Sequence, residues 1–199
     1  MHKLITSSIA ALTLAVSANA AIINLDLIGT AGAGLLPGNE PGSITGGTGG
    51  EIGAGITYDD VTNLLDLTNV GWGSSQGFTD LAGLANNSHI HGATALANGN
   101  GFTQTAGVLV TLTRSSNAIT GGTFTNPLVD LDTVFGVNAE IREAELLAGR
   151  WYLNIHTAAP GNGGGELRGF LVPAPVPEPA SLGLAALGAL TLLRRNRRA

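Results

Sequence analysis

The chain has 199 residues and no cysteine, so a folded domain made from it depends on packing and hydrogen bonds rather than on disulfides. Between residues 21 and 175, four arginines stand against 13 acidic residues, which gives a formal charge of −9 without any lysine. An acidic segment of this kind repels phosphate backbones, which argues against nucleic acid as a partner and favours cations. The chain's 30 glycines and frequent short apolar runs predict an all-β domain rather than disorder.

Residues 1–20 are predicted to be a secretory signal peptide. Lys3 provides a positive charge before an apolar run, and Ala18-Asn19-Ala20 places small residues before a cleavage point at Ala21. The apolar run is too short for a membrane-spanning helix. The protein is therefore expected to be exported, with a β domain over residues 21–172.

Most strands of this domain are predicted from the alternation of apolar and polar residues. Strands are expected at residues 21–30, 51–58, 64–72, 88–92, 106–114 and 119–124. The second and third should form a hairpin around an Asp- and Asn-rich turn, and residues 106–114 should lie in the centre of a sheet. Residues 139–148 are predicted to form a short helix, with Asn138 as its N-cap and Gly149 as its stop.

Residues 150–172 read as the last hairpin: a strand, a glycine-rich turn and a returning strand. Alternation places one set of side chains in the core, namely Trp151, Leu153, Ile155, Leu167 and Leu171. The other set is expected to face outward, namely Tyr152, Asn154, His156, Glu166, Arg168 and Phe170. By the same rule His89 and His91 point outward together, because residues two apart on a strand lie about 6.6 Å apart on one face.

The C-terminal end has three parts in a fixed order. Residues 173–179 (PAPVPEP) form a proline-rich linker, residues 180–193 are almost entirely apolar, and four arginines follow within the last six positions. Fourteen helical residues span about 21 Å, which is less than the roughly 30 Å hydrocarbon core of a bilayer. Residues 180–199 are therefore predicted to be a marginal membrane helix with a basic cytoplasmic tail.

This tail resembles the PEP-CTERM sorting signal of Gram-negative bacteria, with Pro177, Glu178 and Pro179 as its motif. The resemblance implies a precursor anchored transiently in the inner membrane, cleavage near the motif by an exosortase, and a mature form at the outer surface or in the extracellular matrix. It assigns a destination and leaves the activity of the domain open.

The domain itself resembles the CHRD (chordin-type) domain. The resemblance rests on Ser88-His89-Ile90-His91-Gly92, on the run from Trp151 to Thr157 (WYLNIHT), and on Gly165-Glu166-Leu167-Arg168-Gly169. It implies an immunoglobulin-like or superoxide-dismutase-like antiparallel β-sandwich or barrel, here with one short helix before the last hairpin. No general biochemical activity accompanies the family, and the domain has too few histidines for a dinuclear copper-zinc site.

Four residues form the candidate site: His89, His91, His156 and Glu166. Three imidazoles and a carboxylate suit a single zinc or copper ion, which could be redox active. The alternative is a buried polar network in which His156, Asn154, Glu166 and Arg168 fix the hairpin, with Glu166 paired to Arg168. Of these two, we take the network as the basis of the main interpretation.

The sequence thus predicts a non-catalytic structural or binding domain, with an extracellular polysaccharide or protein as its ligand. A mononuclear metal protein is the alternative, and neither interpretation requires enzymatic activity. No nucleophile elbow, phosphate-binding loop or EF-hand spacing is present in the sequence.

Overall fold

The computed structural model describes residues 21–42, 44–96, 102–115, 119–134, 136–162 and 164–175. The predicted signal peptide, the PEP motif and the apolar segment lie outside these residues. Within the described part of the chain, no helix is long and apolar enough to cross a membrane.

The described chain is built almost entirely from antiparallel strands. In chain order these are β1 (Ile22–Gly29), β2 (Gly32–Ala33), β3 (Gly49–Glu51), β4 (Ile56–Asp59), β5 (Leu64–Asp66), β6 (Val70–Trp72), β7 (Ala85–His91), β8 (Val108–Thr111), β9 (Gly122–Thr123), β10 (Leu128–Asp130), β11 (Trp151–Thr157) and β12 (Leu167–Pro173). The helix α1 (Ala139–Leu147) and three 3₁₀ turns, Pro37–Asn39, Ser74–Gln76 and Leu131–Thr133, complete the elements.

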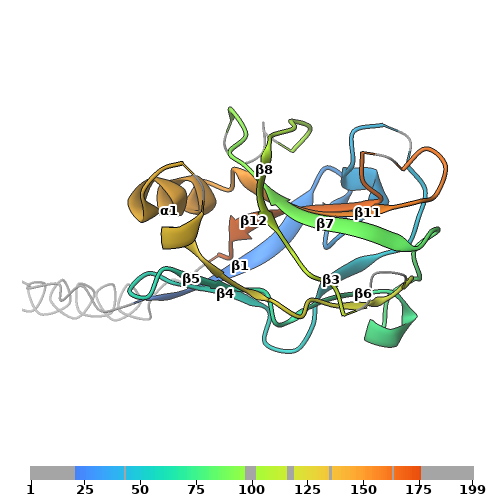
Figure 1. The fold of residues 1–199 in the computed structure, drawn as a ribbon, viewed down its shortest axis with the longest axis horizontal. Coiled ribbons are helices and arrows are strands. Elements are labelled where there is room, and N and C mark those ends of the chain that lie inside the picture. The colour runs from blue at the N-terminus through green and yellow to red at the C-terminus, as the bar shows by residue number, and fades with distance from the viewer. Residues whose placement is uncertain are drawn as a thin grey trace, which may run out of the picture.

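The main sheet curls into a nearly closed barrel with the strand order β10-β5-β4-β1-β12-β11-β7-β8, and β2 pairs with β1. A smaller sheet, β3-β6-β9, covers the lower side in Figure 1. Helix α1 lies at one end of the barrel, and the turn between β11 and β12 lies at the other end (Figure 1). The prediction of an all-β barrel with one short helix before the last hairpin is confirmed.

The barrel interior is filled by alternating strand residues, as the period of two requires. Trp151, Leu153 and Ile155 of β11 are fully buried, and Leu167 and Leu171 of β12 pack in the same core. The core assignment of the last hairpin is therefore correct. Trp72 is also fully buried and lies against Phe124, with ring centroids 5.1 Å apart.

Helix α1 follows its predicted capping pattern. The side chain of Asn138 accepts a hydrogen bond from the amide of Ile141 at 3.3 Å, which satisfies an otherwise unpaired N–H of the first turn. At the other end, Gly149 adopts a φ of +63°, which a residue without Cβ reaches without strain.

Three strand predictions were wrong in detail. The expected strands 51–58 and 64–72 are each divided, so that β4 and β5 lie in the main sheet while β3 and β6 lie in the smaller one. Gly53 and Gly55, with φ of +58° and +77°, turn the chain between β3 and β4. The strand expected in the sheet centre, residues 106–114, contains β8, which is the last strand of the main sheet.

The outward face of the last hairpin is covered by other parts of the chain, as the predicted buried polar network requires. Tyr152, Asn154, Arg168 and Phe170 are each at most 3% exposed, and Glu166 is completely buried. The segment that follows the turn Pro37–Asn39 lies on this face, since Glu40 accepts a hydrogen bond from the side chain of Asn154 and lies 4.0 Å from Nη1 of Arg168. Both faces of β11 and β12 are therefore packed, one with apolar residues and one with polar and aromatic residues.

Candidate functional site

Three histidines meet on the outer face of the β7–β11 pair. His89 and His91 lie two apart on β7, and the register places Tyr152 opposite His91 and Asn154 opposite His89. His156, two residues after Asn154, is therefore the diagonal neighbour of His89. One ring nitrogen from each histidine lies within 4.8 Å of the others, and Nδ1 of His89 is 3.3 Å from Nε2 of His156.

The backbone of the segment before β8 fixes the orientation of His91. Nδ1 of His91 lies 2.9 Å from the carbonyl oxygen of Ala106 and can only act as the donor there. The ring therefore carries its proton on Nδ1 and a lone pair on Nε2. Among the described residues, Nε2 of His91 is buried without any hydrogen-bond partner. A ring held in this way through its other nitrogen is typical of metal-binding histidines.

Burial favours the neutral form of two of these imidazoles, His89 and His91. It lowers the pKa of His89 to about 4, and the neighbouring His156 and His91 act in the same direction. Burial also lowers the pKa of His91, although the bond to Ala106 partly offsets this effect. Because only neutral imidazole coordinates a metal, these shifts favour the metal-binding form of His89 and His91.

Tyr152 connects the histidines to the rest of the hairpin. Its ring stacks on that of His91 with centroids 4.8 Å apart and an interplanar angle of 1°. The guanidinium carbon of Arg168 lies 3.7 Å from the centroid of the Tyr152 ring, a cation–π contact. The Tyr152 hydroxyl also accepts a hydrogen bond from the amide of Ala106 at 3.2 Å. Tyr152 and Ala106 together hold His91 from two sides.

Glu166, the fourth predicted ligand, lies outside this cluster. Its Oε1 accepts hydrogen bonds from the amides of Gly47 (2.9 Å) and Ala82 (2.7 Å). Its Oε2 accepts bonds from the hydroxyl of Thr157 (2.6 Å) and the side-chain amide of Asn162 (3.0 Å). Four donors thus surround a fully buried carboxylate, which fastens two loops and the turn of the hairpin.

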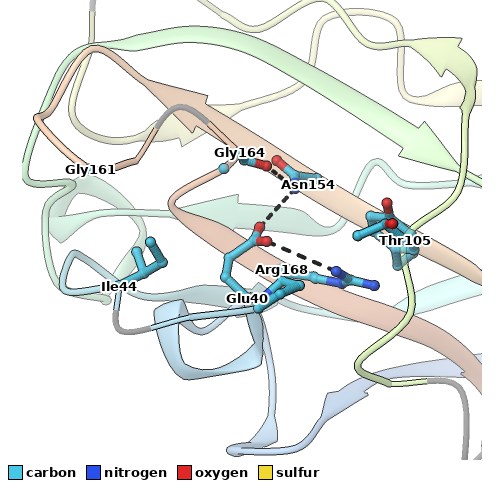
Figure 2. Close-up of a pocket in the computed structure, with 10 residues that line it drawn as sticks. Glu40, Ile44, Thr105, Asn154, Gly161, Gly164 and Arg168 are labelled. Carbon is cyan, nitrogen blue, oxygen red and sulfur yellow. Dashed lines mark hydrogen bonds and ion pairs between the residues drawn. The ribbon is translucent and has the colours of Figure 1, made fainter.

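A second polar cluster lies between the hairpin and the segment that covers it (Figure 2). Asn154 donates a hydrogen bond to Oε1 of Glu40 at 2.7 Å, and Nη1 of Arg168 lies 4.0 Å from Oε2 of Glu40. The predicted polar network therefore exists as two separate clusters, and the predicted pairing of Glu166 with Arg168 is wrong. Arg168 is paired with Glu40, which comes from a distant part of the sequence.

Two sequence profiles match the chain. The profile of the CHRD domain matches residues 34–171, which is more than half of the chain. The chain belongs to the CHRD domain family. A second profile, the PEP-CTERM protein-sorting motif, matches residues 175–198, so the protein is an exported, membrane-processed exosortase substrate. No curated protein and no solved structure matches the chain.

Sequence reasoning did not identify Glu40, Tyr152 or Ala106 as members of the site in this CHRD domain. Glu40 belongs to the segment Leu36–Pro41, which resembles the early acidic and proline-containing part of the family. That resemblance is the sequence feature that could have pointed to Glu40. Ala106 contributes only backbone atoms, which a residue pattern cannot reveal.

Glu40 makes the stability of this CHRD domain depend on pH. Burial raises the pKa of Glu40 to about 7, and Arg168 only partly opposes this effect. A raised carboxyl pKa stabilises the folded state below pH 4.5, and this stabilisation is lost as the pH rises through 7. We expect Glu40→Gln, which is always neutral, to gain about 1–3 kcal/mol of stability relative to wild type between pH 4.5 and 8.

Urea unfolding of both proteins at pH 4.5 and pH 8 measures this difference. Comparing the variant with wild type at each pH cancels the contribution of the histidines. If Glu40→Gln is stabilised relative to wild type no more at pH 8 than at pH 4.5, the raised pKa of Glu40 is contradicted.

Proposed function

We propose that the exported CHRD domain binds a single zinc or copper ion through His89, His91 and His156. The observation that carries this proposal is the convergence of three imidazoles, one of which, His91, has a buried Nε2 without a hydrogen-bond partner among the described residues. The acidic composition of the domain, with a formal charge of −9 over residues 21–175, favours the approach of cations.

The donor set fits these two metals. Nitrogen ligands at 2.0–2.1 Å from a tetrahedral zinc ion lie about 3.3–3.4 Å apart. The distance between His89 and His156 is 3.3 Å, and the His91 nitrogen, which lies within 4.8 Å of both, would move closer when an ion binds. Imidazole suits zinc and copper, whereas magnesium and calcium prefer oxygen ligands. Three protein ligands leave a fourth position for water or another small ligand, and a copper ion held there could be redox active.

Metal-dependent stability tests the proposal. Thermal unfolding of the metal-free protein should shift upward with one equivalent of zinc or copper, and magnesium at the same concentration serves as the control. At a metal concentration 100 times the Kd, the expected stabilisation is about 2.7 kcal/mol. Unchanged unfolding with both transition metals would contradict the proposal.

Tyr152→Phe should weaken metal binding without removing a ligand. The variant keeps the ring that stacks on His91 but loses the hydroxyl that bonds to Ala106, so the segment that orients His91 is held less firmly. Loss of such a supporting contact typically costs about 10–100-fold in affinity, and we expect about 10-fold here. Competition with a chromophoric chelator measures the effect.

Tyr58→Phe provides the matched control for this variant. Tyr58 is also a buried tyrosine with a hydroxyl contact, to Asn63 at 3.1 Å, but it lies on β4 and contacts none of the three histidines. Equal affinities in the two variants would show that Tyr152 plays no part in orienting His91.

We also propose that the domain binds matrix polymer, polysaccharide or protein, without catalysing a reaction on it. The support is a cavity whose walls include the buried polar side chains of Glu40, Asn154 and Arg168. Co-sedimentation of the released protein with the extracellular polymer of the producing cells tests this role. Protein that remains in the supernatant at all polymer concentrations would contradict it.

The precursor is proposed to be held in the inner membrane by residues 180–193 until the exosortase cleaves near Pro177, Glu178 and Pro179. The mature form would then reach the outer surface or the extracellular matrix. The mass of the released protein tests this route, since a product that still contains Arg198 would rule out cleavage.

A further inference from the structure

A cavity of about 230 Å³ lies beside the last hairpin, between the strand face and the segment that covers it. Figure 2 shows Glu40 between Asn154 and Arg168, with Ile44 and Gly161 on one side and Thr105 on the other. Pro41 and Ile44 supply apolar surface, and Gly164 and Gly165 bring the backbone of the turn close to the polar side chains. None of the three histidines lines this cavity.

Two buried polar atoms in the walls of the cavity have no hydrogen-bond partner among the described residues. Asn154 is 2% exposed and its Oδ1 has no hydrogen-bond partner among these residues. Arg168 is 1% exposed and its Nε is likewise without a partner. Buried polar atoms of this kind are costly unless they are satisfied, which points to a ligand or ordered water that completes them.

The contact between Glu40 and Arg168 indicates what kind of group fits. At 4.0 Å, Oε2 of Glu40 and Nη1 of Arg168 are too far apart for a hydrogen bond. When Glu40 is ionised, above pH 7, a group placed beside both atoms must donate to its carboxylate and accept from the guanidinium. A hydroxyl can do both, whereas a carboxylate or phosphate cannot donate and an ammonium cannot accept.

The remaining atoms favour a molecule with several hydroxyl groups. Oδ1 of Asn154 requires a donor, and the Thr105 side chain in the lining can donate or accept. Above pH 7, where Glu40 is ionised, Glu40 disfavours anions and Arg168 disfavours cations, so the cavity suits a neutral ligand. Its volume lies below the roughly 300–1,000 Å³ of sites for drug-sized molecules, which limits the ligand to a single small ring.

We infer that this cavity binds one neutral sugar ring through adjacent hydroxyl groups, as an end or branch of a polysaccharide. The inference rests on the proposed matrix-binding function and specifies its ligand class. Glu40, Asn154 and Arg168 would bind the hydroxyls, and Pro41 and Ile44 would contact the apolar face of the ring. Metal binding is not required, because the histidines do not line the cavity.

Titration of the purified exported protein with methyl glycosides of neutral hexoses, followed by NMR, tests the inference. Shifts are expected at the amides of Thr105, Gly164 and Gly165, with a Kd of the order of 1 mM. Ile44→Trp, which fills the cavity from its half-buried rim, should weaken binding at least about 10-fold. Ile22→Trp, at an exposed isoleucine of β1, is the matched control and should leave the affinity unchanged.

Three results would overturn the inference: binding of glucuronate or acetate in preference to neutral hexoses, equal hexose affinity in Ile44→Trp and wild type, or no hexose binding at all. The proposed matrix-binding function fails separately, if the protein does not co-sediment with extracellular polymer. Co-sedimentation that persists in Ile44→Trp while hexoses do not bind would place the polymer contact elsewhere on the domain. Addition of a chelator should leave hexose binding intact.

Discussion

His91→Ala is expected to weaken zinc or copper binding at least ~1,000-fold. His91 is the proposed ligand whose orientation is fixed by two contacts, the bond from Nδ1 to Ala106 and the stacked ring of Tyr152. Removal of one of three imidazoles leaves two protein ligands, too few for a structural or catalytic zinc site. Competition against a chelator of known affinity measures the loss.

Val108→Ala is the control for this experiment. Val108 pairs with His91 in the register of β7 and β8, and it is 51% exposed. Its truncation changes a cross-strand neighbour of His91 without removing a proposed ligand, so the metal affinity should remain within about twofold. If His91→Ala and Val108→Ala bind the metal equally well, His91 is not a ligand.

Glu166→Gln is expected to destabilise the domain by about 2–4 kcal/mol, or roughly 5–15 °C in Tm. The buried carboxylate accepts four hydrogen bonds, and the amide group of glutamine would point a donor at Thr157 and Asn162. Because Glu166 joins residues 47, 82, 157 and 162, the loss should loosen the end of the barrel opposite α1. Urea and thermal unfolding measure the change.

Glu140→Gln makes the same chemical change at an exposed position in the first turn of α1. Only a weak interaction with the helix dipole is lost there, so the expected cost is below about 1 kcal/mol. If the Glu166→Gln variant is as stable as the Glu140→Gln variant, the buried carboxylate of Glu166 does not fasten the loops. Metal affinity should survive in Glu166→Gln, because Glu166 lies outside the histidine cluster.

The sequence predicted the barrel well where local alternation determines the structure. The core face of β11 and the capped helix α1 follow directly from the spacing of Trp151, Leu153 and Ile155 and from Asn138. The division of residues 51–58 and 64–72 between two sheets could not be predicted in this way. It depends on which strands become neighbours in space, and alternation within one strand carries no information about pairing.

The candidate site was predicted only in part, because strand alternation shows which residues share a face but not which strands become neighbours. The H-x-H spacing places His89 and His91 on one face, but only the β7–β11 register brings His156 to them. Glu166 shares the strand face of Arg168, yet its carboxylate is bound by loop amides that no strand pattern predicts. The coverage of that face by Glu40 is a tertiary contact between segments 128 residues apart, as measured from Glu40 to Arg168.

X-ray absorption spectroscopy of the purified exported protein loaded with one equivalent of zinc or copper tests the central proposal most directly. We predict one tightly bound ion per chain, with three imidazole nitrogens at about 2.0–2.1 Å for zinc and no sulfur. The same spectrum from His91→Ala should lose one imidazole contribution. A wild-type spectrum with only oxygen ligands, or a protein that retains no metal after desalting, would contradict the assignment of His89, His91 and His156 as a metal site.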